Sequence, residues 1–225
     1  MSTRSSEEGD ANDIAISRLG FSIKYWHHFF GQGAKFYNGH VQLPLTTRFD
    51  HIEFQPEILY LDGRRRIPSR TYYEHNISNV VNSDQRIYLF QSSLDALAYF
   101  QLRSMMGTNA IIFVLGKNPD ETVIEYLKKK FHYAKFILCF PKGLMNTISE
   151  IRTTGLLVGE PLTLEIEDNN LLCGYRGRKK QIPLPILTLS RLSRTTGFYP
   201  KSIKTQKPPK GYQSFFDLLR SQKLI

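Results

Sequence analysis

Hydrophobic residues change their spacing three times between residues 86 and 155, and this alternation predicts an α/β core. Three short runs, 86–90, 110–116 and 134–140, are almost wholly apolar. Continuous apolar runs of this length are typical of parallel strands covered on both faces. Each run is followed by a segment with helical spacing. We therefore expect three strand–helix units around a central parallel sheet flanked by helices.

Capping residues mark the ends of the predicted helices. Ser92 and Asp95 form a Ser-x-x-acid capping box for the first helix, and Gly107 ends its apolar pattern. Asn118, followed by a proline, is expected to begin the second helix. Gly155 is expected to stop the third helix.

The segments on either side of this core have weaker patterns. Residues 14–80 are aromatic and rich in turn residues, which predicts a β-rich or α+β extension with turns at Asn38-Gly39 and Asp62-Gly63. Residues 160–185 alternate between apolar and polar positions, which predicts an antiparallel addition. Asp168-Asn169-Asn170 suits a tight turn between its strands.

The chain ends in a basic, proline-rich connection and a short helix, for which Ser214 is the expected N-cap. The predicted organisation is a disordered tail over 1–13, the extension over 14–80, and an α/β domain over 81–225 that ends in the basic segment.

Composition places the chain among globular proteins. The hydrophobic fraction is 41%, enough for a core, and no apolar run approaches the roughly 18 residues of a membrane span. The polar, acidic N-terminus is unlike a signal peptide, and two cysteines argue against a disulfide framework. Cys139, within an apolar run, is expected in the core, and we expect a cytoplasmic protein without a membrane partner.

Positive charge is concentrated in the last quarter of the chain. Residues 1–168 hold 18 Lys/Arg and 19 Asp/Glu, a net charge of −1, whereas residues 169–225 hold 12 Lys/Arg and only Asp217, a net charge of +11. Such a local field attracts phosphates or an acidic partner.

Catalytic groups are expected at the strand tips, because ligands of open parallel sheets bind beyond the carboxyl ends of the strands. The three predicted tips are residues 91–93, 116–118 and 141–143, and none carries a carboxylate. Mg²⁺ prefers carboxylate oxygens, and the six histidines lack the spacing of metal ligands. We therefore predict no metal site and no cofactor.

The segment RIYLFQSSLDALAYFQL, from Arg86, resembles the opening strand and helix of Toprim domains, and is closest to those of plasmid and mobile-element DNA primases. A second strand ending in Gly116 also fits, and PPKGYQSFFDLLRS resembles the closing segment of that family. The likeness spans about residues 86–220, roughly 60% of the chain. It implies a Toprim-like, Rossmann-like sheet.

The departures from the family pattern imply a pseudoenzyme. In the family a glutamate at the first strand tip acts as general acid/base, and an Asp-x-Asp at the third holds Mg²⁺. These positions fall on Gln91 and on Pro141-Lys142-Gly143, and the closing acid pair is reduced to Asp217. We therefore expect no Toprim catalysis, and we expect Lys142 to contact a phosphate where the family holds its metal.

Basic residues interleaved with tyrosines in the C-terminal quarter suit single-stranded nucleic acid, because charges follow phosphates and rings stack on bases. DNA is favoured over RNA, and the resemblance implies a setting in replication or in a mobile element. The predicted nucleic-acid-binding residues are Lys142, Arg176, Arg178, Lys179, Lys180, Lys201, Lys204, Lys207 and Lys210.

Two other functions stay open at this point. The protein could be an interaction or scaffold module whose basic surface binds an acidic protein. It could also be a metal-dependent nucleotidyl-transfer enzyme or nuclease that uses other acids, of which Glu165, Glu167 and Asp168 form the best cluster.

Overall fold

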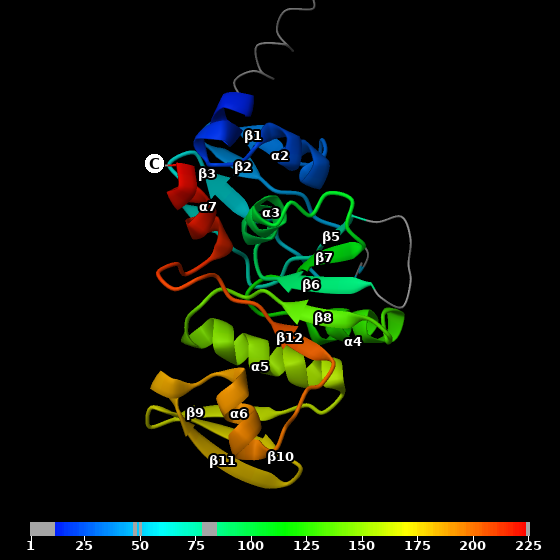
Figure 1. Ribbon diagram of the computed structural model, residues 1–225, viewed down its shortest axis with the longest axis vertical. Coiled ribbons are helices and arrows are strands. Elements are labelled where there is room, and N and C mark those ends of the chain that lie inside the picture. Colours follow the sequence, from blue (N-terminus) through cyan, green and yellow to red (C-terminus); the bar gives the residue numbers. More distant parts are fainter. Residues whose placement is uncertain (1–11, 47–48, 50, 78–84, 224–225) are drawn as a thin grey trace, which may run out of the picture.

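Three β-sheets follow one another along the long axis of the molecule, with helices between them (Figure 1). The computed structural model describes all residues except 1–11, 47–48, 50, 78–84 and 224–225, so most of the predicted N-terminal tail lies outside the described residues. The mixed α/β class predicted from the sequence is confirmed.

The central sheet has five strands in the order β12-β8-β6-β7-β5. Four of them run parallel, and β5 pairs antiparallel with β7 at one edge. The strands are β5 (Tyr73–Asn76), β6 (Arg86–Phe90), β7 (Ala110–Val114), β8 (Lys135–Leu138) and β12 (Ile203–Thr205). All three predicted apolar runs are therefore adjacent parallel strands, while β5 comes from the segment before residue 80.

Each of the three apolar strands leads into a helix. These are α3 (Ser93–Leu102), α4 (Glu121–Lys130) and α5 (Leu144–Val158). One face of the sheet shares a core with α3, and the other shares a separate core with α4 and with Leu157 near the end of α5. The capping box is confirmed, because the Ser92 hydroxyl accepts a hydrogen bond from the backbone N–H of Asp95 at 3.3 Å.

Three predicted helix boundaries are wrong. Helix α3 ends at Leu102, earlier than predicted. Gly107 lies in the turn that leads from the helix to β7 and does not cap the helix. Asp120, rather than Asn118, caps α4, and the Asn118 side-chain amide donates a hydrogen bond to Ser69 instead. Helix α5 continues through Gly155 and ends before Gly159. A Cβ at Gly155 would lie 3.0 Å from the Glu160 carbonyl oxygen, so this glycine permits a close approach of the returning chain.

An antiparallel sheet in the order β1-β2-β3-β4 precedes the central sheet, and its two turns are the predicted Asn-Gly and Asp-Gly turns. It packs with α2 and the later helix α7 (Phe215–Lys223) around the core that contains α3. The elements are α2 (Ile23–Phe30), β1 (Lys35–Tyr37), β2 (His40–Gln42), β3 (Ile58–Tyr60) and β4 (Arg65–Arg66).

The predicted antiparallel addition is confirmed as a third sheet in the order β11-β10-β9. Asp168 and Asn169 form its tight turn with φ angles of 45° and 62°, the left-handed region that these residue types tolerate. The sheet packs with α5 and α6 around a core of its own that includes the buried Cys173. The elements are β9 (Thr163–Glu167), β10 (Asn170–Tyr175), β11 (Arg178–Pro183), the 3₁₀ turn η1 (Leu184–Ile186) and α6 (Leu189–Thr196).

The basic connection after α6 contains a strand that was not predicted from the sequence. Residues 203–205 form β12, which extends the central sheet beside β8. Residues 206–213, here called the strap, then run to α7 (Figure 1). The predicted cap of that helix is confirmed, because the Ser214 hydroxyl accepts a hydrogen bond from the backbone N–H of Asp217 at 3.2 Å.

Candidate nucleic-acid interface

The carboxyl ends of β6 and β7, where catalytic groups are expected, are closed by the protein itself. Gln91, at the end of β6, is 2% exposed, and its amide donates to the Lys117 carbonyl at 3.2 Å. At the end of β7, a Cβ on Gly116 would lie 2.6 Å from the Ser69 carbonyl oxygen. The glycine therefore accommodates the protein's own backbone at this tip.

The strap closes the carboxyl end of β8. The Lys142 ammonium donates to the Pro209 carbonyl at 2.6 Å, and the Lys142 N–H donates to the Gln213 carbonyl at 2.8 Å. Lys207 reaches back to the same tip, where its ammonium contacts the Phe140 carbonyl at 3.1 Å and forms an ion pair with the buried Glu150 carboxylate. The ammonium group of Lys207, a cation of the protein itself, therefore occupies this strand tip.

A buried polar network lies beside the β6 tip and joins the first two sheets. The Glu57 carboxylate, 1% exposed, accepts hydrogen bonds from the Ser92 hydroxyl at 2.7 Å and the Ser93 N–H at 2.6 Å. The Arg65 guanidinium donates to Asp95 at 3.1 Å and to the Ser92 hydroxyl at 3.3 Å. Burial raises the pKa of Glu57 to about 7, although the hydrogen bond from Ser92 and the charge of Arg65 oppose the rise.

Replacing Glu57 with glutamine is expected to remove a pH dependence of stability. The folded pKa lies above the unfolded value, so the stabilisation is present below about pH 4.5 and is lost as the pH rises through about 7. The difference in unfolding free energy, wild type minus Glu57→Gln, is expected to fall by about 3 kcal/mol across this window. Urea unfolding at stepped pH measures it. The exposed Glu167→Gln serves as the control, and a Glu57 difference that stays flat would show that folding does not shift the pKa of this carboxyl.

One face of the central sheet is left partly uncovered, and it forms a groove over β6, β8 and β12. In a parallel sheet, residues in register lie side by side on the same face. Arg86 is in register with Ala110 and with Lys135, and Ile137 is in register with Tyr88 and with Lys204. Two rows of side chains from strands distant in the sequence therefore line the groove.

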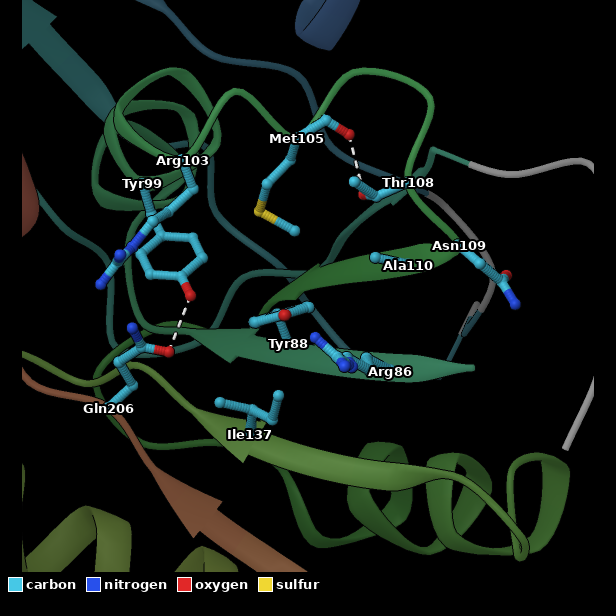
Figure 2. Close-up of a pocket in the computed structure, with 10 residues that line it drawn as sticks. All are labelled: Arg86, Tyr88, Tyr99, Arg103, Met105, Thr108, Asn109, Ala110, Ile137 and Gln206. Carbon is cyan, nitrogen blue, oxygen red and sulfur yellow. Dashed lines mark hydrogen bonds between the residues drawn. The ribbon is translucent and has the colours of Figure 1, made fainter. Parts of the chain in front are cut away.

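The groove contains two adjoining cavities of about 580 and 430 Å³, which share Arg86 and Ile137 in their lining. Figure 2 shows the larger cavity, with Tyr99 and Met105 projecting from above toward the strands. The lining of the two cavities includes four basic side chains and no acidic one among the described residues: Arg86, Arg103, Lys135 and Lys204.

These four basic side chains, here called the groove cations, are exposed and form no ion pair with any residue that the structure describes. By contrast, Arg176 and Lys207 are each paired with a glutamate. Unpaired like charges over a partly apolar floor create a positive field that attracts an anionic ligand.

The predicted nucleic-acid-binding residues are spread over four places. Lys204 lies in the groove, whereas Lys142, Lys207 and Lys210 surround the closed β8 tip or lie on the strap. Lys201 is exposed in the turn before β12. The remaining four lie on the β10–β11 hairpin of the third sheet, where all are exposed: Arg176, Arg178, Lys179 and Lys180.

Three groove cations, Arg86, Arg103 and Lys135, were missed from the sequence. They belong to residues 1–168, where acids balance the basic residues overall. A signal was available, because Arg86 and Lys135 lie at the start of two of the apolar strand runs. Parallel neighbours place such residues together at one end of a sheet, although the strand order was not known.

The acids proposed for alternative metal chemistry lie where the sequence predicted, on one strand and in the turn after it. Glu165 and Glu167 are exposed on β9, and Asp168 lies in the turn that follows. In the part of the chain that the structure describes, no group of three or more His, Cys, Asp or Glu side chains could hold a metal ion. No helix among those residues is long and apolar enough to cross a membrane.

Comparisons with known proteins assign no relative: the chain matches no protein-family model, no curated protein and no solved structure.

Proposed function

We propose that this protein binds single-stranded nucleic acid along the groove of the central sheet and performs no Toprim-type catalysis. The observation that carries the proposal is the set of four unpaired groove cations in a lining without a described acidic side chain. Single-strand recognition combines two elements: cations that follow the nucleic-acid backbone, and an apolar surface beside them on which bases can stack. A duplex directs its bases inward and would leave that floor unused.

The Toprim-like ancestry belongs to this proposal. It is supported by the three consecutive strand–helix units and by the SSLDALAY segment at the start of α3. The absence of catalysis is supported by the chemistry of the tips, because Gln91 is buried and hydrogen-bonded and Lys207 places an ammonium beside the Phe140 carbonyl, just after β8. DNA as the preferred ligand, and a role in replication or in a mobile element, follow from the resemblance alone.

The direct test is a fluorescence-anisotropy titration with a labelled oligothymidylate of about 12 nucleotides, within the roughly 4–16 that such sites cover. We expect binding at about 50 mM salt, with log K falling against log salt with a slope of about −3, because each of four phosphates contributes about −0.7. Duplex DNA and single-stranded RNA are expected to bind more weakly. No binding of the oligothymidylate at about 50 mM salt would overturn the proposal.

An acidic protein is the second candidate partner, because the same unpaired cations would attract carboxylates. Polyglutamate of matched charge separates the two ligands in the same titration. If polyglutamate binds as tightly as the oligothymidylate, the groove recognises charge alone, and an acidic protein becomes the better proposal.

A further inference from the structure

The larger cavity of the groove differs chemically from the smaller one. Besides two arginines, the larger cavity is lined by neutral polar groups and by apolar or aromatic side chains. The smaller one is lined by Arg86, Lys135, Lys204 and Ile137 alone. Because Arg86 and Ile137 border both, one ligand can occupy both cavities at once.

The larger cavity, about 580 Å³, is within the range of small-molecule pockets. Its floor contains Tyr88 and Ile137, together with Ala110, whose short side chain leaves room between β7 and the turn at residues 103–109 (Figure 2). Met105 forms part of the upper wall. A flat group with apolar faces and a polar edge suits such walls better than an inorganic anion does.

The polar edge of the cavity is oriented by a side-chain hydrogen bond. Tyr99 donates its hydroxyl to Gln206 Oε1 at 2.7 Å (Figure 2). The backbone N–H of Gln206 is itself fixed by the Leu138 carbonyl at 2.8 Å. Because the Gln206 side-chain oxygen accepts this hydrogen bond, the amide N–H groups are its remaining donors. They form no hydrogen bond to any residue that the structure describes. The lining therefore presents a donor to a carbonyl on the ligand.

We propose that the larger cavity receives one unstacked nucleobase, whose carbonyl accepts a hydrogen bond from the Gln206 amide. The adjoining phosphates lie over Arg86, Lys135 and Lys204. This inference rests on the proposed function and adds to it a base-specific element. Thymine, uracil, cytosine and guanine carry the required carbonyl group, and adenine does not.

The test compares an oligothymidylate of about 12 nucleotides with an abasic strand of the same length and phosphate count. Wild-type protein is expected to bind the oligothymidylate at least about 10-fold more tightly, because stacking one base on protein side chains contributes roughly this much. Equal binding of the two strands would overturn the base pocket while leaving phosphate-directed binding intact. Binding of neither strand would overturn the proposed function, and this inference with it.

Two variants test whether the base binds in the larger cavity. Ala110→Ile fills it, and is expected to reduce the preference for oligothymidylate to about 2-fold while affinity for the abasic strand stays unchanged. Gln206→Leu removes the donor at similar volume, and is expected to abolish the preference for oligothymidylate over oligoadenylate. Circular dichroism and thermal unfolding verify that each variant is folded. If folded Gln206→Leu retains the wild-type preference, the base lies elsewhere.

Discussion

Exchanging Arg86 and Lys135 together for glutamate is expected to weaken the binding of single-stranded DNA at least about 100-fold at about 50 mM salt. The two residues are in register on neighbouring parallel strands, so the double variant replaces two adjacent cations with two anions. It also removes two phosphate contacts, which should reduce the salt slope by about 1.4. Both side chains are exposed, so we expect the fold to survive.

The matched control is Lys179→Glu with Lys180→Glu on β11, which changes the net charge by the same amount. These lysines lie in the third sheet, outside the groove, where salt screens most of their influence on a bound strand. We expect a loss of at most about 3-fold for this pair. Equal losses in both double variants would mean that binding follows net charge, and a loss confined to the hairpin pair would move the site to the C-terminal surface.

Replacing Lys207 with methionine is expected to lower the free energy of unfolding by about 3–5 kcal/mol at neutral pH, because it leaves the Glu150 carboxylate buried without its cation. Burial already raises the pKa of Glu150, and Lys207 opposes the rise. Without Lys207 the folded pKa rises further above the unfolded value. The variant should therefore recover stability relative to wild type as the pH falls, since protonation removes the buried charge.

Urea unfolding of two further variants shows whether the effect of Lys207→Met comes from the lost ion pair. Lys210→Met changes an exposed lysine of the same strap, and is expected to alter stability by at most about 0.5 kcal/mol. Lys207→Met combined with Glu150→Leu removes the whole pair, and is expected to regain most of the lost stability. If Lys207→Met is as stable as Lys210→Met but binds DNA weakly, Lys207 contacts phosphate, as the sequence predicted, rather than stabilising the tip.

Local patterns were sufficient to predict most of the elements. The strand at 86–90, the antiparallel hairpin after α5 and the cap at Ser214 all depend on residues close to one another in the sequence. One wrong helix end lies beside a long-range contact. The Asn118 side chain donates to Ser69, which comes from the segment before β5, and Asp120 caps α4 instead.

The candidate site was less accessible to prediction from the sequence. Lys204 was identified because it lies in the charged C-terminal quarter, but the other groove cations were not. The charge at Lys207, identified for the same reason, is directed inward by a buried glutamate. Charge counts along the chain show which segments are basic, but they do not show which charges are neutralised by a partner.

The sequence by itself determined the strand–helix alternation, the positions of the tight turns and the absence of carboxylates from the three strand tips. These features follow from local periodicity and from residue chemistry. Only the tertiary structure decided that the tips are closed and that Arg86 and Lys135 share a groove. The reason is that strand order and register are set by burial of the whole apolar core, so residues distant in the sequence become neighbours only after folding.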